Sequence, residues 1–194
     1  MEPTHVDPKQ IVADGYDRIA EQYGAWASQV RQEERAKYTA VLLEKLPVGA
    51  AVLDLGCGAG LPTTHQLAER FAVTGVDLSA RQVALAQHNV PTATFLHTDM
   101  TQLDFDPMSF DGVAAFYSLL HVPRHEHLGL LRKITAWLRA GGGSSPRCGP
   151  MGAKPRLRTI GWARPCAGVA LIVRPQHSWL PRRACVSCVP KRRP

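Results

Sequence analysis

Carboxylates and closely spaced glycines are the residues of this chain that point most directly to chemistry. Asp54 lies in a short apolar run and precedes three glycines on alternate positions, Gly56, Gly58 and Gly60. A glycine at a strand-to-helix turn lets the backbone approach a ligand at a place where any Cβ would collide with it. The carboxyl end of a strand is also where open α/β sheets bind their ligands. We therefore expect a ligand site at this loop.

The spacing of these glycines argues against a phosphate ligand. A dinucleotide-binding fingerprint has the pattern Gly-x-Gly-x-x-Gly, and a P-loop ends in Lys followed by Ser or Thr. Here the third glycine comes one residue early, and Leu61 and Pro62 follow it. An NAD-dependent oxidoreductase and a nucleoside triphosphatase are therefore both disfavoured.

Two further acidic positions favour a nucleoside instead. Asp77 ends a second apolar run, and Asp99 with Met100 follows a third. A carboxylate at the end of the second strand can accept hydrogen bonds from both hydroxyls of a ribose. Asp99 can accept from an exocyclic amine while Met100 packs against the ring, which is how an adenine would be held.

The elements that must position these residues alternate along the chain. Apolar residues at steps of three and four predict helices at 11–30, with Gly15 as a weak point or break, and at 34–46. Short apolar runs predict strands at 51–55, 72–77, 94–97 and 111–117. Helices are also expected at 62–71, at 79–88, where Ser79 and Gln82 have the spacing of a capping box, and at 123–138. This alternation predicts an α/β fold with a doubly wound, mostly parallel sheet.

Four motifs, in order and at suitable spacing, resemble those of the class I S-adenosylmethionine-dependent methyltransferases. The first is Asp54-Leu-Gly-Cys-Gly-Ala-Gly60 and the second is Gly75-Val-Asp77-Leu-Ser. The third is Thr98-Asp99-Met100, and the fourth is Phe110-Asp-Gly-Val with Phe116-Tyr-Ser-Leu-Leu-His121. The resemblance covers roughly residues 10–142. It implies a Rossmann-like methyltransferase fold and S-adenosylmethionine as cofactor.

The resemblance also implies a role for each matching residue. The three glycines of the loop would flank the methionine part of the cofactor, with Asp54 near its amino group. Asp77 would hold the ribose, and Asp99 and Met100 the adenine. The cofactor site implied in this way consists of Tyr16, Tyr23, Asp54, Gly56, Gly58, Gly60, Asp77, Leu78, Asp99, Met100 and Phe116. Tyr16 and Tyr23 resemble residues of an N-terminal lid helix that closes over the cofactor.

Several of these residues also have an ordinary structural explanation. The seven-residue spacing of Tyr16 and Tyr23 is equally typical of a helix that packs against a core. Cys57 is expected to be a small buried filler rather than a nucleophile, because no base lies near it in the sequence. His121 can be a general base or a structural residue at the end of a strand. A base is required only when the methyl acceptor must lose a proton, so no catalytic residue is assigned.

Charge divides the chain into a body and a tail. Residues 1–143 hold all 16 acidic residues and 12 of the 23 basic ones, a net charge of −4, whereas residues 144–194 carry 11 basic residues and no acidic one, a net charge of +11. We expect lid helices at 1–48, a cofactor-binding core at 49–143 and a basic, largely irregular tail at 144–194. The fold is then incomplete after its fourth strand.

The composition of the tail matches a GC-rich coding sequence read out of frame. Our hypothesis is that a frameshift or an aberrant junction follows the methyltransferase body. One segment, 168–173, is strand-like: either it pairs with the fourth strand, or that strand is left as an exposed edge. The tail also contains Cys148, Cys166, Cys185 and Cys188, but their spacing matches no familiar zinc site, and no metal is expected.

The function expected from the sequence is methyl transfer to an O, N or C nucleophile, most readily of a small molecule. The alternative is a truncated remnant that binds S-adenosylmethionine without catalysis. A nucleic-acid binder acting through the basic tail is the third possibility. Against it, the fourth-strand region, Ala115-Phe-Tyr-Ser, lacks the Asn/Asp-Pro-Pro-Tyr/Phe of the family members that methylate nucleic-acid bases.

No apolar run has the length of a membrane span and no signal peptide is recognised, so we expect a cytoplasmic protein. The oligomeric state is not predicted.

Overall fold

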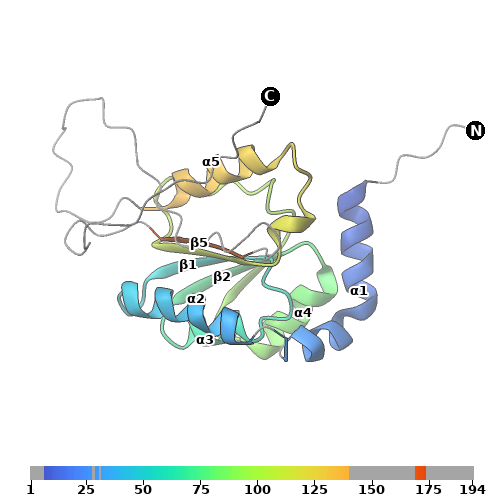
Figure 1. Cartoon of the computed structure of the whole chain (residues 1–194), viewed down its shortest axis with the longest axis horizontal. Coiled ribbons are helices and arrows are strands. Elements are labelled where there is room, and N and C mark those ends of the chain that lie inside the picture. Colours follow the sequence, from blue (N-terminus) through green and yellow to red (C-terminus); the bar gives the residue numbers. More distant parts are fainter. Residues whose placement is uncertain (1–6, 28, 31, 140–168, 174–194) are drawn as a thin grey trace, which may run out of the picture.

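A single sheet organises the part of the chain that the computed structural model describes, residues 7–27, 29–30, 32–139 and 169–173. Its strands have the order β3-β2-β1-β4-β5. Four of them run parallel: β1 (Ala51–Leu55), β2 (Ala72–Asp77), β3 (Thr94–His97) and β4 (Gly112–Phe116). Helices cover both faces of this sheet (Figure 1), as predicted for a doubly wound α/β fold.

The helices divide between the two faces. Three lie on one face: α2 (Gln32–Lys45), α3 (Thr63–Ala68) and α4 (Ala80–Asn89). Helix α5 (His127–Trp137) lies on the other, and α1 (Pro8–Ala27) stands beside one edge of the layers (Figure 1). Within the described ranges no helix has both the length and the apolar character needed to cross a membrane.

The central strands are apolar on both sides because both sides are covered. In β1, Val52 packs into the cluster beneath α2 and α3, whereas Leu53 and Leu55 pack into the cluster beneath α5. Every residue of β4 is buried. A Cβ on Gly112 would lie 2.9 Å from side-chain atoms of Leu42, on α2, and of Leu46, just after it. The near-continuous apolar runs of the sequence therefore correspond to strands buried between two helical layers.

Strand bounds agree with the sequence more closely than helix bounds do. Strands β1, β2 and β3 have the predicted limits, and β4 is one residue shorter at each end. Of the two alternatives left open at Gly15, a weak point or a break, the break does not occur, because α1 continues through it; a glycine costs a helix only about 1 kcal/mol. Helix α5 begins at His127, four residues later than predicted, since Pro123–Glu126 form a turn closed by the Glu126 N–H and the Pro123 carbonyl at 2.9 Å.

A fifth strand resolves one of the alternatives that the sequence left open. Strand β5 (Val169–Val173) pairs antiparallel with β4, in a register from Gly112 opposite Val173 to Phe116 opposite Val169. The fourth strand is therefore flanked on both sides, by β1 and by β5. The predictions of an irregular tail and of no zinc site concern residues that, apart from β5, lie outside the described part of the chain.

Candidate functional site

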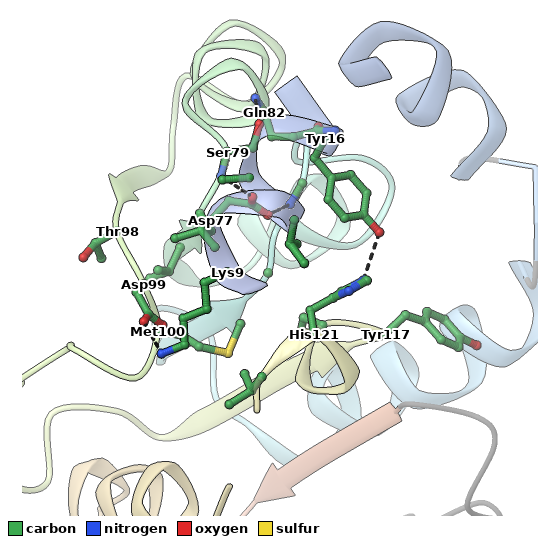
Figure 2. A pocket seen from close by; sticks show the side chains of 18 of the residues that line it. Lys9, Tyr16, Asp77, Ser79, Gln82, Thr98, Asp99, Met100, Tyr117 and His121 are labelled. Carbon is green, nitrogen blue, oxygen red and sulfur yellow. Dashed lines mark hydrogen bonds and ion pairs between the residues drawn. The ribbon is translucent and has the colours of Figure 1, made fainter. Parts of the chain in front are cut away.

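A pocket opens where the carboxyl ends of the parallel strands meet helix α1. It has an empty volume of about 710 Å³, part of which is open to solvent. Nine of the eleven predicted cofactor residues line it: Tyr16, Tyr23, Gly56, Gly58, Asp77, Leu78, Asp99, Met100 and Phe116. Figure 2 labels Tyr16, Asp77, Asp99 and Met100 among them. Residues from positions 16 to 116 thus converge on one pocket at this edge of the sheet.

The glycine loop, Gly56–Gly60, is fixed by backbone contacts. The N–H groups of Gly56 and Cys57 both donate to the Val76 carbonyl, at 2.7 and 3.0 Å. Gly56 has a φ of +76°, and a Cβ there would lie 2.1 Å from the Cβ of Ser118. Gly58 has a φ of +55°, and a Cβ there would make an ordinary contact with Gln82 Oε1 at 3.8 Å. Gly56 is therefore required by packing, whereas at Gly58 only the backbone angle favours glycine.

Asp77 lies beside the loop with both carboxylate oxygens engaged. One accepts from the Gly58 N–H at 2.8 Å and the other from the Ser79 N–H at 3.0 Å. Burial raises the pKa of this carboxyl, and the two backbone N–H bonds oppose the rise. A carboxylate has about four acceptor positions, so Asp77 keeps capacity for ligand hydroxyls while the protein fixes its orientation.

Two predicted residues, Asp54 and Gly60, do not line the pocket. Asp54 is buried behind the loop and accepts from the Thr64 hydroxyl at 2.7 Å. Burial raises the pKa of Asp54 to about 6, against the lowering effects of Thr64 and the Arg35 charge. A Cβ on Gly60 would lie 3.1 Å from the side chain of Val90, so Gly60 lets the loop approach α4. In this structure both residues support the loop from behind.

Asp99 and Met100 lie on the opposite side of the pocket, beside the start of α1. The Lys9 ammonium donates to Asp99 at 2.6 Å, and the Thr101 hydroxyl donates to the same carboxylate at 2.8 Å. Burial raises the pKa of Asp99, but these hydrogen bonds and the Lys9 charge outweigh it and hold the pKa below its usual range. Lys9 was not among the residues predicted from the sequence, where it is an ordinary charge that precedes the helix expected at 11–30.

Gln82 is a second pocket residue that sequence reasoning did not assign to the site. In a capping box, its side chain would accept from the N–H of Ser79. Asp77 accepts that N–H instead, and only the other half of the box forms, from the Gln82 N–H to the Ser79 hydroxyl at 3.1 Å. The Gln82 side chain is 1% exposed and lines the pocket, and among the described residues it has no hydrogen-bond partner at its oxygen or its nitrogen.

An aromatic group from helix α1 meets His121 across the pocket. The Tyr16 hydroxyl lies 3.0 Å from His121 Nε2, and the two rings are perpendicular (Figure 2). The Tyr23 ring packs edge-on against Tyr16 with centroids 4.8 Å apart. Burial lowers the pKa of His121, partly offset by the charge of Asp77, and burial raises the pKa of Tyr16. His121 is therefore neutral near pH 7.

The residue after β4, Tyr117, also lines the pocket in a strained backbone conformation. Its φ is +59°, which a non-glycine residue adopts at a cost of about 1–2 kcal/mol. Its hydroxyl donates to Glu34 on α2 at 2.6 Å. Strain of this kind clusters at ligand-binding sites. Tyr117 belongs to the fourth motif, but nothing in that motif indicates its strained backbone, because its backbone angles depend on the contacts around it.

The two helices in the predicted lid segment lie in different places. Helix α1 contributes five residues to the pocket, Lys9, Val12, Ala13, Tyr16 and Tyr23. Helix α2 instead packs under the sheet, with Leu42 fully buried. Only α1 therefore lies where a lid would be.

The described residues include neither a reactive thiol nor a cluster of metal ligands. The Cys57 side chain is buried, and burial raises the pKa of its thiol well above the usual value. A thiol of this kind is a poor nucleophile near neutral pH. Among the residues whose positions are described, no cluster of three or more His, Cys, Asp or Glu side chains could hold a metal ion.

Comparison with known proteins identifies the same region. Residues 52–142 match a family model described as a methyltransferase domain. The chain is 31% identical over 160 residues to 27-O-demethylrifamycin SV methyltransferase of Amycolatopsis mediterranei, covering 72% of this chain and 58% of the relative. It is 37% identical over 117 residues to trans-aconitate 2-methyltransferase of Paracidovorax citrulli, covering 57% and 44%. The chain thus spans about half the length of these relatives.

A solved structure with a bound cofactor product resembles the fold. The magnesium protoporphyrin IX methyltransferase of Synechocystis PCC 6803, determined with S-adenosylhomocysteine, superposes with a TM-score of 0.55 at 25% identity. The match covers 68% of each chain.

Proposed function

We propose that this chain, which belongs to the class I S-adenosylmethionine-dependent methyltransferases, binds S-adenosylmethionine in the pocket and transfers its methyl group to a small molecule. The matched relatives are named for small-molecule acceptors, a rifamycin and trans-aconitate. Because the chain spans about half their length, the acceptor is inferred as a class and not taken from either name.

The observation that carries the proposal is the unpartnered Gln82 amide. A buried polar group without a partner costs about 1–3 kcal/mol, and Gln82 presents both a donor and an acceptor to the pocket. Asp77 offers only acceptors. A ribose hydroxyl both donates and accepts hydrogen bonds. Asp77 can accept from the hydroxyls of the diol and the Gln82 amide can also donate to them, so the two side chains together provide all the hydrogen bonds that neither would provide alone. The pocket therefore fits an adenosyl group by its hydrogen-bonding capacity.

The other lining residues extend this assignment. Gly56 and Gly58 would border the methionine part, with Asp54 and Gly60 holding the loop from behind. Asp99 would accept from the adenine amine, with Met100, Leu78 and Phe116 as apolar neighbours, and Tyr16 and Tyr23 would close over the cofactor. When bound, the cofactor supplies a methyl group on a positively charged sulfur, and its displacement depends mainly on how the acceptor is oriented.

His121 is the residue placed to receive a proton from the acceptor. It is neutral near pH 7, lines the pocket, and contacts the Tyr16 hydroxyl at 3.0 Å. Tyr16 can donate to Nε2 and so hold the ring until an acceptor hydroxyl replaces it. This role applies to acceptors that lose a proton on methylation, and Tyr16 acts as the residue that orients His121.

Isothermal titration calorimetry with S-adenosylhomocysteine tests the binding proposal. We expect Gln82→Met and Asp77→Ala to weaken binding by about tenfold or more each, since each removes ligand hydrogen bonds. Thr39→Val is the matched control, because the Thr39 hydroxyl is also buried and unpartnered but lies away from the pocket. Equal affinity for all four proteins would overturn the proposed cofactor site.

Turnover separates an enzyme from a binding remnant. Transfer of labelled methyl groups to small carboxylic acids and phenols supports the enzyme, whereas tight S-adenosylhomocysteine binding without any transfer supports the remnant.

We also propose a cytoplasmic location and a core at 49–143 that binds the cofactor. Binding to nucleic acid through residues 144–194 is not part of the proposed function.

A further inference from the structure

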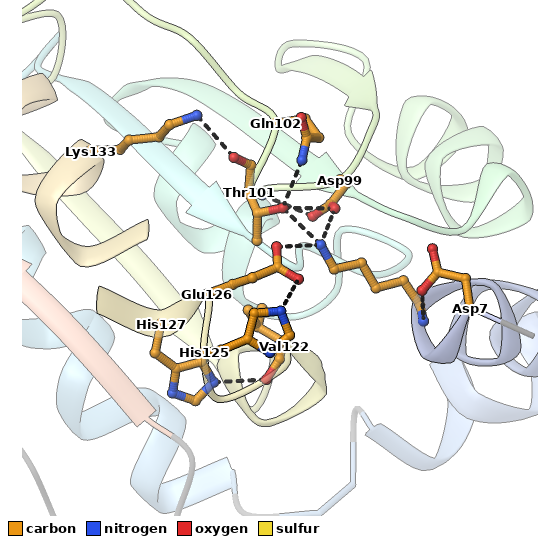
Figure 3. Close-up of polar contacts among 10 residues, drawn as sticks. Asp7, Asp99, Thr101, Gln102, Val122, His125, Glu126, His127 and Lys133 are labelled. Carbon is orange, nitrogen blue, oxygen red and sulfur yellow. Dashed lines mark hydrogen bonds and ion pairs between the residues drawn. The ribbon is translucent and has the colours of Figure 1, made fainter. Parts of the chain in front are cut away.

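One lysine joins three separate parts of the molecule at the rim of the pocket. The ammonium of Lys9, in the first turn of α1, donates to Asp99 at 2.6 Å, to the Thr101 hydroxyl at 2.9 Å and to Glu126 at 2.5 Å. Asp99 and Thr101 follow β3, and Glu126 immediately precedes α5; Figure 3 shows this cluster. The Lys9 side chain is 14% exposed. All three donors of the ammonium are therefore used, largely away from solvent.

The rest of α1 has little apolar attachment of its own. Its fully buried residues are Ala13, Ala20 and Ala27, Val12, Tyr16 and Tyr23 are half-buried, and Ile11, Ile19 and Trp26 are exposed. Burying an alanine contributes far less than burying a leucine or a phenylalanine, because the transfer free energy follows the area removed from water. Polar contacts therefore carry much of the attachment of α1.

The Lys9 cluster is also where two carboxylates converge. Asp99 and Glu126 both contact the same ammonium, and without it their like charges would face each other in a half-buried place. Removing Lys9 therefore does more than delete hydrogen bonds, since it leaves a repulsion that pushes the segments apart.

Asp99 links this cluster to the bound ligand. Of its roughly four acceptor positions, three are used, by Lys9, by the Thr101 hydroxyl and by the Thr101 N–H at 2.8 Å. One position is left for an adenine amine. Lys9 thus fixes the carboxylate while leaving it one acceptor for the ligand.

We infer that Lys9 is the positioning residue that closes helix α1 over the pocket, tying the lid to the adenine side through Asp99 and to α5 through Glu126. This inference rests on the proposed function for the identity of the ligand. With Lys9 in place, Tyr16, two turns further along α1, lies against His121. Without it, α1 separates from the pocket and bound cofactor escapes faster.

Hydrogen–deuterium exchange on the ligand-free protein tests the closure without any ligand. We expect Lys9→Met to raise amide exchange in residues 8–27 while exchange in β1 and β2 stays unchanged, and Lys9→Arg to restore protection. Lys133→Met is the matched control, because Lys133 also donates to the segment after β3, at the carbonyls of Thr101 and Leu103, but from α5. Equal protection of α1 in Lys9→Met and the wild type would overturn the inference.

Stopped-flow dissociation of S-adenosylhomocysteine tests the consequence for the ligand. We expect the dissociation rate to rise about tenfold or more in Lys9→Met, because Asp99 and Glu126 lose the half-buried ammonium with which they pair. The association rate should change less. Glu126→Gln removes the other carboxylate charge that pairs with Lys9. It should raise the dissociation rate by a smaller factor, since Asp99 still holds Lys9.

The proposed cofactor site and the proposed role of Lys9 are disproved by different results. If the wild type does not bind S-adenosylhomocysteine, the proposed function fails, and the exchange experiment still decides whether Lys9 closes α1. If the wild type binds and Lys9→Met releases the ligand at the same rate, the inference fails and the proposed function stands. A fall in the association rate alone would also overturn it, because closure acts on the bound state.

Discussion

The glycine loop and helix α1, which form two walls of the pocket, are held in place by different kinds of interaction. The glycine loop, Gly56–Gly60, is fastened by backbone N–H groups to the Val76 carbonyl, above strands whose Leu53 and Leu55 are fully buried. Helix α1 buries only alanines and attaches through the side chains of Lys9, Tyr16 and Asp17. The loop is thus part of the folded core, whereas α1 is an addition to it.

This difference matches what each wall has to do. A ligand that is bound through backbone geometry needs a wall that is already in place. A ligand that enters a pocket also needs a part that can move away, and such parts come from the less stable regions of a protein. Substitutions in the loop should therefore affect folding, and those in α1 should affect ligand exchange and turnover.

The largest effect is expected from a pair of loop glycines. Gly56→Ala should destabilise the protein by roughly 3 kcal/mol or more, because its Cβ would collide with Ser118 in a left-handed backbone. Gly58→Ala should cost about 1 kcal/mol, because only the backbone strain applies there. Urea unfolding measures both. Similar free energies of unfolding for the two variants would mean that the loop is not fixed by packing.

A large effect on turnover is expected from Tyr16→Phe. The phenylalanine keeps the edge contacts with Tyr23 and His121 but removes the hydroxyl that contacts His121 Nε2. We expect kcat to fall about tenfold for an acceptor that loses a proton, with the free energy of unfolding nearly unchanged. Steady-state kinetics and urea unfolding provide the two values. An unchanged kcat would assign Tyr16 to packing alone.

A smaller effect is expected from Asp17→Asn, which weakens the second polar attachment of α1. Asp17 accepts from the Ser79 hydroxyl and from the Arg81 N–H at 3.0 Å, and these bonds lower the pKa of Asp17. We expect a loss of about 0.5–1 kcal/mol, typical of a bond to a helix N-terminus. Amide exchange in α1 and thermal unfolding detect it.

Glu21→Gln is the control for that experiment. Glu21 pairs with the side chain of Arg81 at an exposed position, and exposed pairs contribute little. A larger effect for Glu21→Gln than for Asp17→Asn would show that the Arg81 side chain, and not the start of α4, holds the helix.

The smallest effect concerns the titration of His121, which lies between the two walls. Burial lowers its folded-state pKa below 6.5, so the unfolded chain takes up the proton first. Its contribution to stability is therefore complete above pH 6.5 and is lost as the pH falls through the folded-state value. NMR titration of the imidazole should show a midpoint below 6.5. Asp77→Asn should lower it further, because the Asp77 charge favours the imidazolium; a rise would contradict this.

The fold and most of the pocket followed from patterns local in the sequence. Short apolar runs marked the strands. Because parallel strands share one carboxyl edge, the glycines and carboxylates that follow these runs also marked the side of the sheet where the pocket lies. Helix limits were harder to predict. Nothing near Pro123 distinguishes a turn from the first turn of a helix, and Gly15 weakens a helix without ending it.

The capping box shows where local patterns mislead. The spacing of Ser79 and Gln82 predicted correctly that a helix begins there, with the bond from the Gln82 N–H to the Ser79 hydroxyl. The other half of the box, a hydrogen bond from the Ser79 N–H to the Gln82 side chain, does not form. Asp77, at the end of β2, accepts that N–H instead. Sequence alone could not reveal that competition, and it is what leaves the Gln82 amide free in the pocket.

The sequence by itself determined the α/β fold, the glycine loop and the carboxylates at the ends of β2 and β3, because these depend on residue type and spacing over a few residues. Only the tertiary structure decided that Asp54 and Gly60 lie behind the loop, that Tyr16 meets His121, and that Lys9 joins α1 to Asp99 and Glu126. These contacts join residues as far as 117 positions apart, and a side chain's partner at that distance is set by packing and not by spacing.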